Sequence, residues 1–566
     1  MRNTSKNGNL KVNAIAGTYV VTLGWDLPKA DCAGLLGFSV HRLDHAENTS
    51  KFLEGMKAFK ETDPGFPAGS LYPSNKQPYQ SFQWADYAAE PGRKYTYTIT
   101  ALKGTPKNLV PFIATAVVVT TESPKNGDHD VYFNRGNAAS QEYVRRFGDV
   151  APDKAENPEA AFAWLSRGAY EALTEFVESC LPGKHSLRIA AYEFNYEPFL
   201  QLIKKKSKDI DIQIIYDARS ESPGATNTRL VKKHKLTKLT KRMNKTASFI
   251  SHNKFILKLE NGKPSSVWTG GMNFSDGGIF GHSNVAHVVE IENVAKKYHD
   301  YWNTLKDDLV VPSVSVDAKK AANILTFRRM NETLSPFPPN PVPQGTTAVF
   351  SPRLSLQALN SYADLALSAQ NGLFMTFAFG MNDVFKDVYR NSPAGFRLAL
   401  MEKKAGPNKD KAKVKAEELA IQKLRNLPEN VFAVGDFIRT NDFDGWVKER
   451  LTGLNVNVRY VHNKFMLVDP LSADPIIVGG SANFSNASTT NNDENMLIVR
   501  GNKRVADIYL GEFMRLFSHF SFRESLKFRK PNQPPKPLDT GDWWKDHFGS
   551  TPRSARREYF ANKFHL

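Results

Sequence analysis

The sequence predicts a small all-β sandwich followed by two α/β halves that resemble each other. Three observations lead to this prediction. A short polar motif occurs twice with the same spacing, a Pro-rich connection separates two stretches of alternating strand and helix patterns, and the first 125 residues carry only strand patterns. A chain of 566 residues is also too long for one hydrophobic core, which agrees with several domains.

Residues 1–125 read as a separate β-sandwich because short alternating runs are divided by Pro, Gly and Asn clusters. The expected strands are Thr18–Trp25, Leu36–Arg42, Lys94–Ala101 and Ile113–Thr121. Trp25 on an early strand and the Tyr95 and Tyr97 pair on a late one resemble core positions of a fibronectin type III domain. This resemblance concerns the fold, and such a sandwich is more often a spacer or adhesion module than a catalytic unit.

Residues 126–330 form the first α/β half. Apolar residues at helical spacing predict one helix over Ala160–Cys180, followed by a strand over Leu187–Phe194. A helix over Phe199–Lys206 and a strand over Ile210–Tyr216 come next. This order predicts a βαβ unit and a layered α/β architecture.

Residues 331–345 are a Pro-rich connection that we expect to be stiff and extended rather than helical. The second half, residues 346–526, restarts at Val349 in a stretch that echoes the one at Val131. Its apolar strand Gly372–Phe379 is the counterpart of the strand in the first half. Residues 527–566 are rich in Pro, Lys and Arg, and the sequence leaves open whether they pack across the body as an arm or form a basic tail.

The composition favours a polyanionic partner and a reducing compartment. Lys and Arg outnumber Asp and Glu by 75 to 58, which gives a net charge of +17, although a merely soluble basic surface is the alternative. With two Cys in the chain, a disulfide framework is excluded. No apolar run has the length of a membrane span and no signal-peptide pattern follows Met1, so we expect a cytoplasmic protein, with export by another route left open.

The repeated motif carries the candidate functional residues. The first copy contains His252, Lys254, Asn273 and Ser275. The second copy contains His462, Lys464, Asn483 and Ser485. In both copies Lys follows His by two positions and Asn follows His by 21 (273 − 252 and 483 − 462).

These residue types suit attack on a phosphodiester. The reaction needs a nucleophile, a proton donor for the leaving oxygen, and cationic or hydrogen-bonding groups on the other phosphate oxygens. An imidazole, with an ordinary pKa of about 6.5, can serve in the first two roles. Lysine ammonium groups and asparagine amides can serve in the third. The set holds neither a Cys cluster nor a concentration of carboxylates, so it implies no metal and no other cofactor.

The two motif copies resemble the signature of the phospholipase D superfamily, and the resemblance covers residues 131 to about 525. It implies two phospholipase D-like halves and a phosphohistidine intermediate. By the resemblance, His252 is the nucleophile and His462 the general acid that then activates water or an alcohol. The sequence alone does not fix which histidine has which role.

The two halves depart from the family pattern in their acidic residues. Asp469 completes the pattern in the second half, whereas Leu259 stands at its place in the first. The tyrosyl-DNA phosphodiesterase branch of the family also lacks this acid, so its role is interpreted as structural. Glu494, eleven residues after Asn483, matches the family's acid that orients an imidazole, and we assign it to His252.

The equivalent of Glu494 in the first half is Asn284. His462 therefore either lacks a carboxylate partner or is served by Glu290, further along the chain. A second open feature is the stretch 232–245, which carries seven Lys or Arg and no acid shortly before His252. It is either a rim that attracts polyanions or an ordinary solvated face.

The sequence thus predicts a phosphodiesterase of the phospholipase D type, with phospholipid as the leading substrate and peripheral membrane contact. The alternatives are a metal-independent nuclease, favoured by the basic charge, and a non-enzymatic polyanion-binding protein with a decayed site. Superfamily chains that carry both motif copies often act on lipids, an argument by analogy. One chain can complete the site, so no oligomer is required, and hydrolysis versus transfer to an alcohol stays open.

Overall fold

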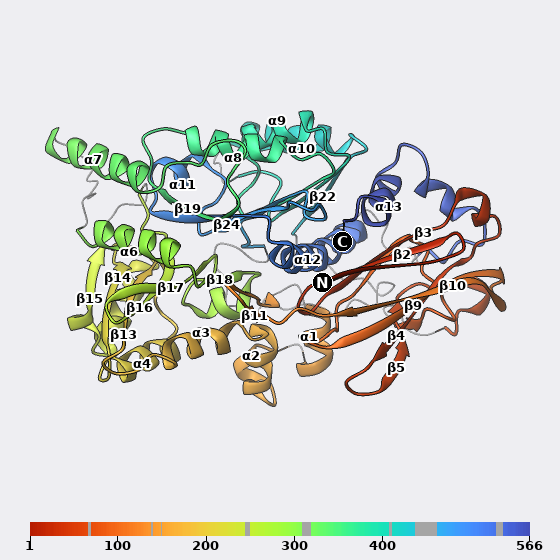
Figure 1. Cartoon of the computed structure of the whole chain (residues 1–566), viewed down its shortest axis with the longest axis horizontal. Coiled ribbons are helices and arrows are strands. Elements are labelled where there is room, and N and C mark those ends of the chain that lie inside the picture. Colours follow the sequence, from red (N-terminus) through yellow and green to blue (C-terminus); the bar gives the residue numbers. More distant parts are fainter. Residues whose placement is uncertain are drawn as a thin grey trace.

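The computed structural model describes residues 1–65, 70–136, 140–148, 150–243, 249–307, 318–406, 410–435, 461–527 and 536–565. Figure 1 shows a β-sandwich and two α/β parts, with the long helix α12 (Lys503–Lys527) where the three meet. The predicted fold class is confirmed, because an all-β region precedes two α/β halves with the same strand order. No helix of the described residues is long and apolar enough to cross a membrane.

The N-terminal region consists of two four-stranded antiparallel sheets. One sheet has the order β1 (Arg2–Asn7), β2 (Leu10–Ala16), β3 (Val21–Asp26) and β8 (Gln83–Asp86). The other has the order β10 (Asn108–Thr120), β9 (Lys94–Thr105), β4 (Gly37–Asp44) and β5 (Thr49–Phe52). Trp25, Tyr95 and Tyr97 are buried in the core between the sheets, as expected of a sandwich. A short pair, β6 (Glu54–Gly55) and β7 (Tyr72–Pro73), lies apart from both sheets.

The first α/β half is built on one eight-stranded mixed sheet. In spatial order its strands are β11 (Lys125–Asn126), β12 (His129–Phe133), β18 (Val285–Val289), β17 (Lys263–Gly270), β16 (Lys254–Glu260), β13 (His185–Ala191), β14 (Asp211–Asp217) and β15 (Thr240–Met243). Its helices are α1 (Ser140–Phe147), α2 (Pro158–Ser166), α3 (Ala169–Glu178), α4 (Glu197–Lys206), α5 (Gly224–Lys233) and α6 (Glu292–Lys306). The parallel β13–β14 pair, joined by α4, is the predicted βαβ unit.

The second half repeats this order with seven strands. They are β19 (Gly345–Ser351), β25 (Glu494–Arg500), β24 (Ile476–Gly480), β23 (Phe465–Val468), β20 (Gly372–Phe377), β21 (Phe396–Met401) and β22 (Asn430–Val434). Its helices are α8 (Gln357–Leu367), α9 (Asp383–Asn391), α10 (Lys411–Arg425), α11 (Asn486–Thr490) and α12. Every residue of β20 is buried, because helices cover both faces of the sheet, and this explains why the strand reads as a continuous apolar run.

The two halves share a hydrophobic core. It combines buried side chains of both sheets with those of α6 and α12, which occupy equivalent places in the two halves, for example Phe255, Phe465, Trp302 and Phe513. Two parallel β-bridges also join the halves, Ser251 with Asp493 and Ser283 with Val461. The repeated units are therefore fixed against each other at the level of the backbone.

Two predictions about local structure need correction. The helix expected over Ala160–Cys180 is two helices, because Arg167 and Gly168 take left-handed backbone conformations with φ of 49° and 87° and end α2 before α3 begins. The connection 331–345 is not extended throughout. Helix α7 (Ala318–Leu334) continues to Leu334, since the first proline, Pro336, lies beyond it.

The C-terminal residues 536–565 pack against the sandwich. Trp543 and Trp544 are part of its core, and Trp543 Nε1 donates to the carbonyl of Leu35 at 2.7 Å. Helix α13 (Pro552–Asn562) lies against β3, where the side chain of Asn13 on β2 donates to the carbonyl of Phe560. Of the two alternatives for this segment, the packed arm is the one observed.

Candidate active site

Both motif histidines lie where the two halves touch. His252 directly follows the bridge residue Ser251, and His462 directly follows the bridge residue Val461. The backbone N–H of His252 donates to the carbonyl of Asp493 at 3.1 Å, and that of His462 donates to the carbonyl of Ser283 at 3.3 Å. The backbone of each histidine is thus held by the residues just before a strand of the opposite half, β25 for His252 and β18 for His462.

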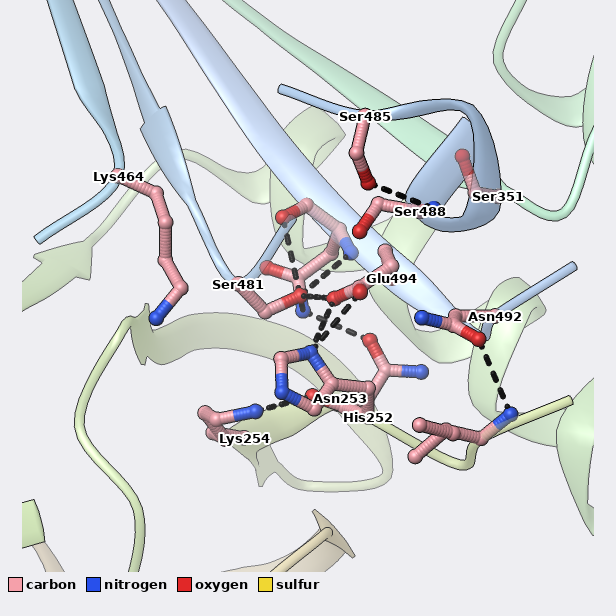
Figure 2. Close-up of polar contacts among 12 residues, drawn as sticks. His252, Asn253, Lys254, Ser351, Lys464, Ser481, Ser485, Ser488, Asn492 and Glu494 are labelled. Atoms are coloured by element: carbon pink, nitrogen blue, oxygen red, sulfur yellow. Dashed lines mark hydrogen bonds and ion pairs between the residues drawn. The ribbon is translucent and has the colours of Figure 1, made fainter. Parts of the chain in front are cut away.

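His252 is paired with a carboxylate from the second half. Its Nδ1 lies 2.9 Å and 2.8 Å from the two carboxylate oxygens of Glu494, which also accepts a hydrogen bond of 2.6 Å from the Ser481 hydroxyl (Figure 2). The contact expected from the family resemblance is therefore present. Burial acts to raise the pKa of Glu494, but the charge and hydrogen bond of His252 outweigh it and hold this pKa below its usual value.

His462 is paired with an amide instead. Its Nδ1 lies 2.9 Å from Asn284 Oδ1. The side-chain nitrogen of Asn284 donates to the carbonyl of Gly278 at 2.8 Å and lies 2.9 Å from Nδ1 of His282. Burial and then the positive charge of Lys464 push the pKa of His462 well below its ordinary value. For His252, burial lowers the pKa to about 4 against the opposing effect of Glu494.

The two motif lysines are buried beside the histidines. Lys254 Nζ donates to the carbonyl of His252, and Lys464 Nζ donates to the carbonyl of His462 at 2.7 Å. Figure 2 shows both lysine side chains extending on the same side of His252. Burial lowers the pKa of Lys254 to about 8 and that of Lys464 further, and the two ammonium groups repel each other. A bound anion would stabilise their charged forms.

Asn273 is buried and Asn483 is half-buried, and they lie just after the ends of β17 and β24. The side-chain oxygens of Asn273 and Asn483 have no hydrogen-bond partner within the described part of the chain. An amide without a partner can turn its nitrogen toward an incoming phosphate oxygen. Both motif serines accept from the N–H three residues later, Ser275 from Gly278 at 3.1 Å and Ser485 from Ser488 at 3.3 Å, and Ser275 also donates to Glu193 at 2.5 Å.

Two acidic candidates lie outside the site. Asp469 accepts hydrogen bonds of 2.7–2.8 Å from the backbone N–H groups of Gln370, Asn371 and Gly372, which is the structural role expected for it. Glu290 follows β18 and is exposed, and its backbone N–H bonds to the carbonyl of Asp128. The suggestion that Glu290 serves His462 is wrong, because Asn284 occupies that position.

Three further residues of the site were not singled out from the sequence. Ser481 holds Glu494, His282 lies against His462 with ring centroids 4.3 Å apart, and Tyr192 lies against His252 at 4.7 Å. The motif itself contained a signal for Ser481, because its counterpart in the first copy is Gly271. Among the described residues, no three His, Cys, Asp or Glu side chains come together in a group that could hold a metal ion.

Comparison with known proteins identifies the class. Residues 180–306 and 375–517 match the family described as "Cardiolipin synthase, PLD-like domain", and the two segments contain the two motif copies. The two α/β halves are therefore phospholipase D-like domains, and the predicted resemblance to the phospholipase D superfamily is confirmed. A search of curated proteins finds no match.

Solved structures with a similar arrangement include three enzymes. Phosphatidylserine synthase from Haemophilus influenzae Rd KW20 is 14% identical with a TM-score of 0.44, over 64% of this chain and 88% of the synthase. Polyphosphate kinase from Porphyromonas gingivalis is 8% identical with a TM-score of 0.39, and the match spans 68% of this chain but 53% of the kinase. Yeast tyrosyl-DNA phosphodiesterase is 12% identical with a TM-score of 0.31, over 56% and 82%. All three TM-scores lie below 0.5.

Proposed function

We propose that the protein is a phosphodiesterase of the phospholipase D type that acts through a phosphohistidine on His252. The observation that carries this proposal is the unequal pairing of the two imidazoles, His252 with the Glu494 carboxylate and His462 with the Asn284 amide. Two identical partners would leave the roles of the histidines undetermined. Different partners make one imidazole a better nucleophile and the other a better acid.

The first step forms a bond between His252 Nε2 and phosphorus and breaks the bond between phosphorus and the leaving oxygen. The attacking ring becomes positively charged, because Nε2 gives its lone pair while Nδ1 keeps its proton. Glu494 accepts a hydrogen bond from that Nδ1–H and stabilises the charge, as the aspartate does for the imidazolium of a Ser-His-Asp triad. His252 with its pKa near 4 is neutral at pH 7, so its Nε2 lone pair is available.

His462 supplies the proton in this step. Burial and Lys464 hold the pKa of His462 well below its ordinary value in the free site, so its imidazolium forms when a bound phosphodiester anion offsets the charge of the two lysines. As an imidazolium it gives the Nε2 proton to the leaving oxygen, and as a neutral imidazole it then takes a proton from water or an alcohol, whose oxygen attacks phosphorus and releases His252. An amide partner does not stabilise the imidazolium as a carboxylate would, so the proton is given up more readily. Lys254 and Lys464 neutralise the phosphate oxygens throughout.

Phospholipid is the substrate that we favour, on the family description and on the two motif copies in one chain. The test uses purified protein in EDTA with vesicles of mixed zwitterionic and anionic phospholipid, and His252→Ala as the control. Headgroup release that disappears in the control is the expected result. Added alcohol separates hydrolysis from transfer, because transfer yields a new phosphatidyl alcohol.

A nuclease is the second candidate, and the basic stretch 232–245 favours it. Lys232, Lys233, Lys235, Lys238, Lys241 and Arg242 are exposed, while residues 244–245 lie outside the described residues. Hydrogen bonds connect this stretch to the active site. The carbonyl of Met243, the last residue of β15, accepts from the N–H of Ala218. The next residue, Arg219, donates to the hydroxyl of Tyr192, whose ring lies against His252. Single- and double-stranded DNA therefore belong in the same assay. Turnover of neither substrate class would favour the polyanion-binding alternative.

A further inference from the structure

A third imidazole lies in the site and has no part in the two-histidine chemistry. His282 follows the π-helical turn Gly277–Gly281, is buried, and packs its ring on that of His462 with an interplanar angle of 38°. Its Nδ1 faces the side-chain nitrogen of Asn284, which in turn holds His462. The equivalent position in the second half is Asn492, whose side chain accepts from the backbone N–H of Ile250 (Figure 2).

The Gly278 carbonyl indicates the direction of each hydrogen bond in the series that joins it through Asn284 to His282 and His462. The carbonyl of Gly278 can only accept, so the Asn284 atom that faces it at 2.8 Å must be the amide nitrogen. That nitrogen has only donors, and therefore His282 Nδ1 accepts and its ring proton is on Nε2. The Asn284 oxygen can only accept, so His462 must carry a proton on Nδ1. Its Nε2 is then the atom left for the chemistry.

We propose that His282 is a positioning residue that, together with the Gly278 carbonyl, holds the Asn284 amide in this orientation and, through it, the Nδ1–H tautomer of His462. Both hydrogens of the amide nitrogen have an acceptor, one in the Gly278 carbonyl and the other in His282 Nδ1. A proton on His282 Nδ1 would remove the second acceptor and weaken the preference for this orientation over the rotated one, in which the amide nitrogen faces His462 and only the Gly278 carbonyl opposes the rotation. The inference rests on the proposed function only in that His462 is the acid of that mechanism.

The surroundings of His282 keep this nitrogen free of a proton. The neighbouring titratable groups are His462, packed on its ring, and the ammonium groups of Lys464 and Lys254. Burial and then the charge of Lys464 lower the pKa of His282 to about 3, so its neutral form persists down to acidic pH.

Two substitutions separate the hydrogen bond from the packing. His282→Asn keeps an acceptor near the place of Nδ1 but loses the ring, whereas His282→Phe keeps a ring but loses the acceptor. With bis(p-nitrophenyl) phosphate as substrate, we expect kcat of His282→Phe to fall by about 10- to 100-fold at nearly unchanged KM, and His282→Asn to stay within about threefold of wild type. Equal losses in the two variants, or full activity of His282→Phe, would overturn the proposal. Thermal unfolding of both variants checks that they are folded.

A spectroscopic measurement tests the effect of His282 on the His462 tautomer without turnover. In protein carrying 15N-labelled histidine, the His462 signals, assigned with His462→Gln, should report the Nδ1–H tautomer in wild type and in His282→Asn. We expect a mixture of tautomers in His282→Phe. An unchanged His462 tautomer in His282→Phe would overturn the proposal even if the enzyme is active. If wild type cleaves no phosphodiester, the proposed function fails. The tautomer measurement still shows whether His282 controls the tautomer of His462.

Discussion

The two half-sites have the same backbone arrangement, but the residue that pairs with the motif histidine differs between them. Counted from the motif histidine of its own half, the residue that pairs with the histidine of the opposite half lies at the same offset, since 284 − 252 and 494 − 462 both equal 32. At that offset the second half provides Glu494, supported by the Ser481 hydroxyl. The first half provides Asn284, supported by the Gly278 carbonyl and His282, with Gly271 in the place of Ser481. The repeat thus fixes where the imidazoles lie, and the exceptions to the repeat distinguish their roles.

The largest expected effect comes from the histidines themselves. His252→Ala and His462→Ala should each reduce kcat by about 1,000-fold or more, because one removes the nucleophile and the other the proton donor. A p-nitrophenyl ester leaves readily without a proton, so His462→Ala should slow the first step, measured as a burst of p-nitrophenol, much less than it slows release of an alkyl leaving group, although the second step still lacks its base. Equal slowing of this first step by the two variants on both substrates would contradict the division of roles.

Exchanging the partners should alter rate and pH dependence in different ways. Glu494→Gln removes the charge that stabilises the cationic ring of His252, and we expect kcat to fall by about 10- to 100-fold. Asn284→Asp adds a carboxylate beside His462, which stabilises the imidazolium and raises the pKa of His462. A general acid is lost above its pKa, so the alkaline limb of the kcat profile should move to higher pH. A shift to lower pH would show that His462 does not act as the acid.

The asparagines between His and Lys of the two motifs should differ in their contribution to stability. Asn253 accepts from Asn495 at 2.7 Å and donates to Tyr301, whereas both side-chain polar atoms of Asn463 are buried without a partner within the described part of the chain. Asn253→Ala should lower the free energy of unfolding by about 1–3 kcal/mol, because it leaves buried partners unpaired. Asn463→Ala should change it little or raise it. Urea unfolding of both variants measures the difference, and equal losses would contradict the asymmetry.

The smallest effect concerns the acid that the first half lacks. Asp469→Ala removes the acceptor of three backbone N–H groups and places alanine at a φ of 46°, so we expect a loss of about 1–2 kcal/mol of stability with kcat nearly unchanged. Asp469→Asn keeps an acceptor and tolerates this backbone conformation, and should lose less. A large drop in kcat at unchanged stability would show a chemical role instead.

Much of the fold followed from the sequence because the repeat is visible in it. The motif spacing placed both histidines, lysines and asparagines at equivalent positions of the two halves, and in the structure these residues lie at or beside the ends of equivalent strands. The position eleven residues after the motif asparagine led to Glu494 as the partner of His252 and to Asn284 as its equivalent in the first half. The sequence left open whether His462 lacks a carboxylate partner or is served by Glu290, and it did not predict the pairing with the Asn284 amide. Glu290 follows the end of β18, where the chain has left the site.

Other features depend on conformation that residue patterns do not record. The apolar spacing from Phe162 to Phe176 continues across Arg167 and Gly168 because α2 and α3 pack on the same core, so a single helix was predicted. His282 gave no signal either, since its importance comes from a hydrogen bond to Asn284 and from packing against the other half. Such contacts depend on how the two halves pack against each other, which the residue pattern within one half does not show.

The location of the covalent intermediate tests the central claim most directly. Rapid acid-free quenching of His462→Asn with bis(p-nitrophenyl) phosphate in EDTA, followed by peptide mass spectrometry at alkaline pH, should trap the enzyme after the first step, because its second step lacks a base. The account predicts a phosphoryl adduct on the peptide that carries His252, and no adduct in His252→Asn. An adduct on His462 in the His252→Asn protein would contradict the assignment of the nucleophile to the histidine paired with Glu494.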